Sequence, residues 1–293
     1  TAHLHRAPPQ ESAHPDLLIH PDVSPAAFAA TFRLGLQDTF VYRWNILLRG
    51  IVTIIPLLAT VALWDAVFSS DSPGDSPLAA YGREGMTLYF ITAMIVHTLV
   101  TPTEDEWRIA AEIRDGQVSA LVTKPLSHLA YRLSLFLSSR IIYTVLSLPV
   151  IALILWTLRD SIQLPTHPET WLWFTVSTAM AALIQFFIAY SLAMLAFWFL
   201  EVSTIIFLFY SFEYFLSGNV FPLDLLPPAL APVTKYAVFT YELYFPITVF
   251  LERMDPSALR EGVLIQSAWV LISAGIAKLM WNLGVRRYEA VGI

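Results

Sequence analysis

The chain has 293 residues, of which 56% are hydrophobic and only 14% are charged, and its mean hydropathy is +0.61. Soluble domains usually carry about 25% charged residues, so this composition predicts a membrane protein and leaves little chain for a separate catalytic domain. The net charge of -6 says little about topology, because Asp and Glu hardly influence it. The absence of cysteine excludes disulfides, thiolate metal sites and cysteine nucleophiles.

The N-terminal segment is polar and rich in Pro and His, without the apolar core of a signal peptide. We expect residues 1–23 to form a flexible cytoplasmic tail. Ser24 and Pro25 then predict the start of a helix, as N-cap and first helical residue. Large apolar residues follow at every fourth position, which favours an amphipathic helix in the membrane interface over an ordinary core helix. They are Phe28, Phe32, Leu36, Phe40 and Trp44.

Six apolar segments predict membrane-spanning helices. The clearest, residues 45–68, is long enough to cross a ~30 Å hydrocarbon core at ~1.5 Å per residue. The others are residues 86–102, 134–158, 171–200, 202–217 and 262–283. Residues 220–261 are apolar but interrupted by prolines, which fits two short re-entrant or interfacial helices better than a straight span. The predicted fold class is all-α, a polytopic membrane protein with six transmembrane helices.

The distribution of basic residues predicts the orientation. With the N-terminus inside, twelve of the 17 Lys and Arg residues lie on the cytoplasmic side or at the span ends that face it. The positive-inside rule therefore favours both termini in the cytoplasm. An even number of spans requires the two termini to lie on the same side.

The polar segment between the second and third spans carries the clearest helix signals. Thr103 and Glu106 have the spacing of a capping box, so we expect a helix that runs to about Asp115 and stops at Gly116. Its solvent face presents Arg108, Glu112, Arg114 and Asp115. A charged helix at the membrane surface suits the docking of a soluble partner, and a solvated connector is the alternative.

Polar side chains inside membrane segments are costly and are often functional. Glu213 lies well inside the fifth span, His97 lies in the second and Gln185 in the fourth, whereas Glu242 falls in the proline-broken region. We predict that Glu213, Gln185 and His97 line a substrate path. The alternatives are a hydrogen-bonded helix contact for Glu213 and a packing role for His97.

Several catalytic motifs are absent from the sequence. It contains neither the P-loop GxxxxGK[ST], nor HExxH, nor GxSxG, so this chain is expected to bind no nucleotide and to lack those hydrolytic sites. His97, Glu104 and Glu106 could suggest a metal site, but they straddle a predicted helix break. No cofactor, metal or nucleic acid is therefore expected on this chain.

Four short blocks, in this order and spacing, resemble the ABC-2 type permeases, which are membrane subunits of one class of ABC exporter. The blocks are residues 40–45 (FVYRWN), 113–116 (IRDG) with 121–126 (LVTKPL), 215–218 (FLSG) through 221–227 (FPLDLLP), and 286–292 (RRYEAVG). The closest likeness is to small six-span permeases.

The resemblance implies that residues 24–293 form an ABC-2 transmembrane domain in a prokaryotic plasma membrane. The helix before the first span would be the connecting helix, and residues 103–126 would dock on a separate ATPase subunit that binds ATP and Mg. The docking residues would be Arg108, Glu112, Arg114, Asp115 and Gly116. The proline-broken region would close the path on the outside, with Gly218, Pro222 and Glu242 at this gate. Two permeases, identical or related, would pair with two ATPase subunits to form the exporter. The apolar faces of the spans and the single carboxylate deep within one of them favour an amphipathic or lipid-like substrate.

Three other functions are compatible with the sequence. An ion-coupled secondary transporter would use Glu213 as a proton or ion site. A membrane-embedded lipid-modifying enzyme would use His97 with a nearby carboxylate. A purely structural membrane subunit would have no transport path.

Overall fold

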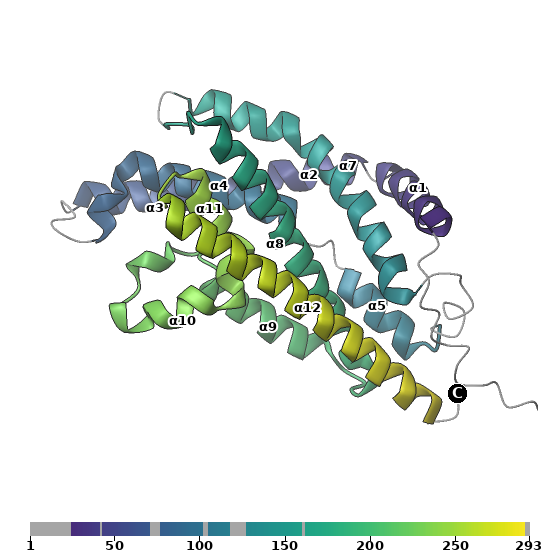
Figure 1. Cartoon of the computed structure of the whole chain (residues 1–293). Coiled ribbons are helices and arrows are strands. Elements are labelled where there is room, and N and C mark those ends of the chain that lie inside the picture. Colours follow the sequence, from purple (N-terminus) through teal and green to yellow (C-terminus); the bar gives the residue numbers. More distant parts are fainter. Residues whose placement is uncertain are drawn as a thin grey trace, which may run out of the picture.

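The computed structural model describes residues 25–41, 43–70, 77–101, 105–117, 127–159 and 162–290. Within these ranges every regular element is helical, which confirms the predicted all-α class (Figure 1). Some sequence-based predictions lie outside the described residues. They are the tail at residues 1–23, the Ser24 and Thr103 caps, the block at residues 121–126 and the last two residues of the block at 286–292.

The N-terminal helices pack against one side of the bundle. Helix α1 (Pro25–Val41) packs along α7 (His128–Thr157), and is followed by α2 (Arg43–Val52) and α3 (Ile54–Ser70). The predicted apolar stripe is divided between two environments. Phe28, Phe32 and Leu36 are half-buried on the same face as Gly35, which lies against Ser138 of α7. The other two, Phe40 and Trp44, are exposed. A position in the membrane interface stays a prediction.

Helix α8 (Pro168–Met194) is the central element of the described chain. It packs against α4 (Gly82–Val100), α5 (Asp105–Arg114), α11 (Phe245–Phe250) and α12 (Pro256–Ala290). Ala181, Ala189 and Ala193 of α8 are fully or almost fully buried, and such small residues allow neighbouring helices to approach closely. In Figure 1, α8 and α12 run beside each other, and α5 lies toward the C-terminal end of α12.

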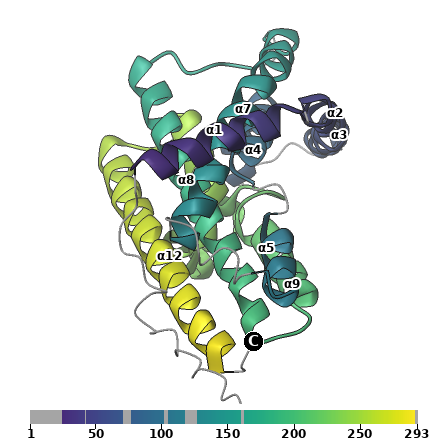
Figure 2. The same ribbon diagram turned by 90° about the vertical axis from the view of Figure 1, so that its right-hand side faces the viewer.

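The fourth apolar segment ends earlier than its composition predicts. After α8 the chain forms a short turn, η3 (Leu195–Phe197), and then breaks before α9 (Ser203–Leu216). Glu201 lies in this break, and its carboxylate accepts a hydrogen bond from the backbone N–H of Ser203 at 2.8 Å. Figure 2 shows α5 beside α9 on the side of the molecule opposite α12.

The proline-broken region contains more short helices than the two predicted, and their re-entrant or interfacial placement stays a prediction. It contains η4 (Leu223–Leu225), η5 (Pro228–Leu230), α10 (Ala231–Tyr236), the π-helix η6 (Thr240–Tyr244) and α11, and η2 (Pro77–Ala80) lies near η4. Proline lacks an N–H and clashes with the preceding turn, which explains why no long helix forms here. Single turns of π-helix are rare, and those that do occur are often found at functional sites.

Four helical stretches in the described chain are long and apolar enough to cross a membrane. They are Arg43–Ser69, His128–Thr157, Pro168–Phe197 and Pro256–Arg287. Helix α9 is apolar but has only 14 residues, and α4 carries Arg83, Glu84 and His97 within its 19 residues. The prediction of six spans therefore stays a prediction for these two segments.

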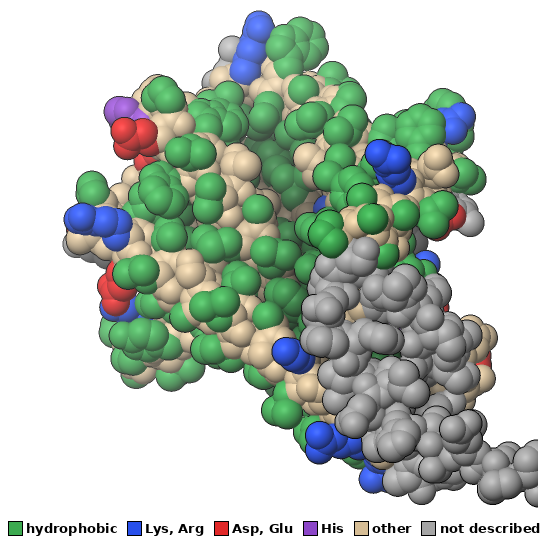
Figure 3. Space-filling model, turned by 45° about the vertical axis from the view of Figure 1, so that its right-hand side comes forward, with side chains coloured by type: hydrophobic (Ala, Val, Ile, Leu, Met, Phe, Trp, Pro, Cys, Tyr) green, Lys and Arg blue, Asp and Glu red, His purple; other side chains and the backbone are tan. Residues whose placement is uncertain are grey.

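The molecular surface matches a lipid environment. Large apolar side chains are exposed on several helices, among them Trp156 at 64%, Phe207 at 67% and Leu271 at 73%. Figure 3 shows hydrophobic side chains spread over most of the described surface on one face, with the charged groups toward its edges. Such extensive apolar exposure would be unfavourable in water.

Candidate functional site: an acidic cavity beside helix α5

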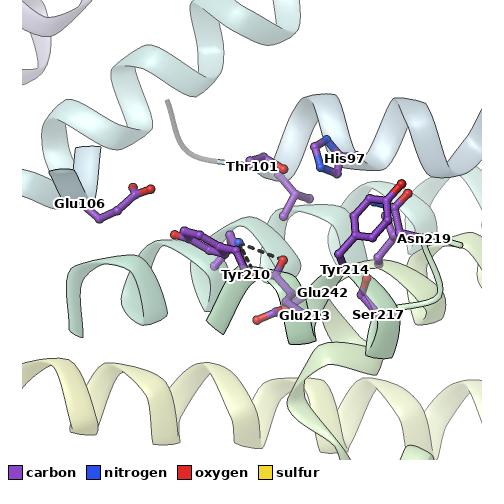
Figure 4. Close-up of a pocket in the computed structure, with 12 residues that line it drawn as sticks. His97, Thr101, Glu106, Tyr210, Glu213, Tyr214, Ser217, Asn219 and Glu242 are labelled. Carbon is purple, nitrogen blue, oxygen red and sulfur yellow. Dashed lines mark hydrogen bonds between the residues drawn. The ribbon is translucent and has the colours of Figure 1, made fainter. Parts of the chain in front are cut away.

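A cavity of about 360 Å³ lies between α4, α5, α8, α9 and the π-helix η6. Figure 4 shows its lining side chains, which come from segments far apart in the sequence. They are His97, Val100, Thr101, Glu106, Gln185, Tyr210, Glu213, Tyr214, Ser217, Asn219, Glu242 and Leu243. Three of the twelve are glutamates, so the cavity is acidic although it lies within an apolar bundle.

Glu213 is held by the buried side chain of Gln185. The Gln185 amide nitrogen donates to the two carboxylate oxygens of Glu213, with N···O distances of 3.1 and 3.2 Å. Gln185 belongs to the central helix α8 and is 2% exposed, so the rigid core fixes the position of the amide. Its own carbonyl oxygen has no hydrogen-bond donor in the described part of the chain.

Glu242 is the most buried carboxylate of the cavity. It belongs to the π-helix η6 and is 2% exposed, and neither of its oxygens accepts a hydrogen bond from a described residue. It is also close enough to Glu213 for the two carboxylates to repel each other. Burial of an unpaired carboxylate is unfavourable, so this group needs a proton or a positively charged partner.

Glu106 connects the cavity with α5. It is 5% exposed, on the same face of α5 as the buried Ile109, Ala110 and Ile113. Tyr210 of α9 points its hydroxyl group toward Glu106 (Figure 4). At the other end His97 and Tyr214 are exposed, so the cavity opens on that side.

Helix α5 is also fixed to the bundle by an ion pair. The Arg132 guanidinium of α7 binds the Glu112 carboxylate, and Arg132 is 5% exposed. The Arg132 Nε–H also donates to His128 Nε2 at 3.4 Å, and His128 Nδ1 lies 2.7 Å from the Tyr190 hydroxyl of α8. The His128 ring stacks on Trp281 of α12 at 4.2 Å between ring centroids. This chain of contacts joins α5 to α7, α8 and α12.

Comparison with known proteins identifies the family. Residues 54–292 match the model of the ABC-2 family transporter proteins. The chain therefore belongs to the ABC-2 family. No curated protein matches the chain. The match and the four long apolar helices together make this ABC-2 protein an integral membrane protein and a transport permease. ABC-2 permeases generally work with ABC ATPases.

The structure brings together the residues predicted for a path in this ABC-2 permease. His97, Gln185 and Glu213 all line the one cavity. Glu242 was predicted at the outer gate from the family resemblance, and it lines the same cavity. Pro222 is buried at the start of η4 and does not line the cavity. The roles in a path and a gate stay predictions.

Gly218, the third residue predicted at the gate, lies between two cavity residues, Ser217 and Asn219. Its backbone φ is +91°, and its carbonyl oxygen accepts a hydrogen bond from the Tyr89 hydroxyl at 2.6 Å. This turn therefore positions the side chains on either side of it.

The residues predicted for docking divide into two groups. Arg108 and Arg114 on α5 and Asp115 directly after it are exposed, whereas Glu112 turns inward to Arg132. Gly116 has a φ of +76° and ends the helix, and the N–H of Gln117 donates to the Glu112 carbonyl at 2.9 Å. A left-handed glycine after the last turn is the usual helix stop.

The position of Glu106 in the cavity was not predicted from the sequence, because this residue was interpreted as part of a capping box. The signal was nevertheless present, since Glu106, Ile109, Ala110 and Ile113 share the spacing of one helix face. A carboxylate on an apolar helix face indicates a buried acidic group. Tyr210, Tyr214, Thr101 and Asn219 carried no comparable signal.

Proposed function

We propose that this chain is the permease subunit of an ATP-driven exporter, in which the acidic cavity is part of the substrate path and α5 docks on a separate ATPase subunit. The observation that carries the proposal is the position of α5. This helix places Glu106 in the cavity, while Arg108 and Arg114 on the helix and Asp115 directly after it are exposed. A single short helix therefore has access to both the cavity and a soluble partner.

The contacts of α5 suit the transmission of motion. It packs on α8 and η3, and the Glu112–Arg132 ion pair fixes it to α7. A displacement of α5 by a bound ATPase would shift Glu106 relative to Gln185 and Glu213 on α8 and α9. The cavity would then change shape without any nucleotide site on this chain.

The contact of α5 with both the ATPase and the cavity gives the transport mechanism. ATP binding closes the ATPase dimer and moves α5, and the cavity between α4, α8, α9 and η6 opens toward the outside. ATP must interact differently with the two states, and that difference arises in the partner, which binds the nucleotide and Mg. We infer that two permeases, identical or related, assemble with two ATPase subunits, with six spans each and both termini in the cytoplasm.

Co-purification with an ABC ATPase encoded beside this chain tests the proposal. Wild-type chain is compared with the doubly charge-reversed variant Arg114→Glu/Asp115→Lys, and Arg260→Glu serves as the control. Arg260 is also exposed, but it lies near the start of α12, at the end distant from α5 (Figure 1). The proposal predicts a stable wild-type complex, weakened about tenfold or more by the double variant and unchanged by the control. If wild type binds no ATPase, the proposal is wrong.

The ion-coupled transporter is a second candidate, favoured by one observation. Glu242 is buried, Glu213 is half-buried, and the two carboxylates lie close together. Proton-coupled carriers use intramembrane carboxylates of this kind. Transport driven by an ion gradient in the absence of any ATPase would favour this candidate over the exporter.

A further inference from the structure

The hydrogen-bonding balance of the cavity indicates what it binds. Both Glu242 oxygens and the Gln185 carbonyl oxygen lack a donor in the described chain, and both residues are 2% exposed. These three atoms are acceptors, as is the Glu213 carboxylate, which already accepts from Gln185. Buried acceptors are normally paired, so these three atoms require donors that the described residues do not provide. A ligand that pairs with these acceptors must supply N–H or O–H groups.

The charge balance is equally one-sided. Three glutamates line the cavity, and no Lys or Arg is among the lining residues that the structure describes. Arg140 contacts the lining residue Thr101, but its guanidinium donates to the Thr101 backbone carbonyl and stacks over the Tyr143 ring, 4.7 Å from the ring centroid. His97 is the one lining side chain that could carry positive charge, and it lies at the open end. The closed end, with Glu242, Gln185 and Glu213, therefore favours a cation.

The size and apolar lining of the cavity favour an organic cation over a bare metal ion. No group of three or more His, Asp or Glu residues among the described ones is arranged to hold a metal. A volume of about 360 Å³ falls within the range of small-molecule sites, and Val100, Leu243 and the rings of Tyr210 and Tyr214 line it. Aromatic faces attract ammonium groups, and aliphatic side chains accept a hydrocarbon body.

We propose that the cavity binds an amphipathic primary amine in its protonated form, with the ammonium group between Glu242, Glu213 and the Gln185 carbonyl oxygen and the apolar part toward Tyr210 and Tyr214. Figure 4 shows Glu213 and Glu242 next to each other, with the two tyrosines close by. The three N–H donors of an ammonium group match the acceptors that the chain leaves unpaired. This inference deepens the proposed function, on which it rests, by naming the substrate class of the exporter.

Binding of dansylcadaverine, a fluorescent alkylamine, to the permease–ATPase complex in lipid nanodiscs tests the proposal. N-acetyl-dansylcadaverine is the matched ligand, because acetylation removes the charge and leaves the apolar part unchanged. Binding is the saturable fluorescence increase above that of empty nanodiscs. We expect the amine to bind at least about tenfold more tightly than its acetylated form, since a buried charged partner is lost. This comparison uses the wild-type complex and does not depend on the folding of any variant.

Variants then locate the site. Glu242→Gln keeps the shape of the side chain and removes its charge, and we expect it to weaken amine binding about tenfold or more. Glu84→Gln is the control, because Glu84 is exposed at the far end of α4 from His97. Retained co-purification of the ATPase shows that each variant is folded.

Two results would overturn the inference. The first is equal binding of the amine and its acetylated form, which would indicate that the carboxylates are neutralised by protons and not by a bound amine. The second is undiminished amine binding by the Glu242→Gln variant. Failure of the proposed function is distinguishable. If no ATPase binds the wild-type chain but the permease alone still selects the amine through Glu242, the exporter assignment fails and the amine site stands.

Discussion

Arg132 of α7 and Glu112 of α5 form an ion pair in which the arginine side chain is 5% exposed and the glutamate 23%. The pair joins α5, which has both exposed residues and a residue in the cavity, to a helix long enough to span the membrane. A charge as buried as Arg132 is costly without its partner. This contact therefore helps to hold α5 in place, in addition to the packing of α5 on α8 and η3.

Removal of one partner should destabilise the protein. We expect Glu112→Gln to lower the free energy of unfolding by about 1–3 kcal/mol, because Arg132 stays buried and charged. The measurement is thermal unfolding of the purified chain. The double variant Glu112→Gln/Arg132→Gln should be destabilised less than the sum of the single variants.

The control for this pair is Glu261→Gln. Glu261 pairs with Lys235 at 2.8 Å, but the two side chains are 51% and 48% exposed, and exposed ion pairs contribute little. We expect no measurable change in its melting temperature. If Glu112→Gln behaves in the same way, the Glu112–Arg132 pair does not fix α5.

A second prediction concerns the turn that carries Ser217 and Asn219. At Gly218, with φ at +91°, an added Cβ would lie 2.7 Å from the Tyr89 hydroxyl oxygen. Gly218→Ala should therefore cost about 1–3 kcal/mol of stability, from the strained backbone and the lost space. Gly275→Ala is the control, because nothing lies within 4 Å of its Cβ position in the middle of α12. Equal melting temperatures for the two variants would contradict this account of Gly218.

The third prediction is a pH dependence at the start of α12. Asp255 Oδ1 accepts hydrogen bonds from the backbone N–H of Ala258 at 2.7 Å and from the Ser257 hydroxyl at 3.0 Å. The bond from the Ala258 backbone N–H, more than that from Ser257, holds the pKa of Asp255 below its ordinary value. Since the carboxylate form is the one bound, its stabilisation is complete above the unfolded pKa, about 3.9, and is lost as the pH falls through the lower folded pKa.

Asp255→Asn and Asp255→Ala separate charge from capping. Both variants should melt below wild type at neutral pH, with Asn nearer to wild type because its side chain still caps the helix. The difference between wild type and Asn should disappear at the acid end of a melting series. A difference that grows as the pH falls would contradict the assignment.

Much of the fold could be predicted from the sequence. The apolar runs fix four long helices, and Gly116 and the prolines after Pro222 stop helices where their backbone chemistry requires it. The length of α8 was wrong by several residues, because apolar composition continues through Leu200 while the backbone turns after Met194. Hydropathy reports the solvent that a segment prefers and does not report a change of direction between two apolar segments.

The candidate site was predicted in part. Glu213, Gln185 and His97 stood out as polar groups in apolar segments, and they do share a cavity. Their meeting with Glu242 and Glu106 depends on the packing of η6 and α5 against α8, which is a long-range property. The inward turn of Glu112 was likewise hidden, because its partner Arg132 lies twenty residues further along the chain.

In the proposed exporter, closure of the partner ATPase around ATP changes the shape of the cavity of this chain. The chain has no cysteine, so Asn219→Cys places a single thiol in the cavity wall. The measurement is the rate at which a maleimide modifies this thiol in the permease–ATPase complex, without nucleotide and after vanadate has trapped ADP in the closed ATPase dimer. We expect the modification rate to change several-fold on trapping, and we expect Glu112→Gln to reduce this change. An equal rate in both states, or a rate that responds to an ion gradient without any ATPase, would contradict it.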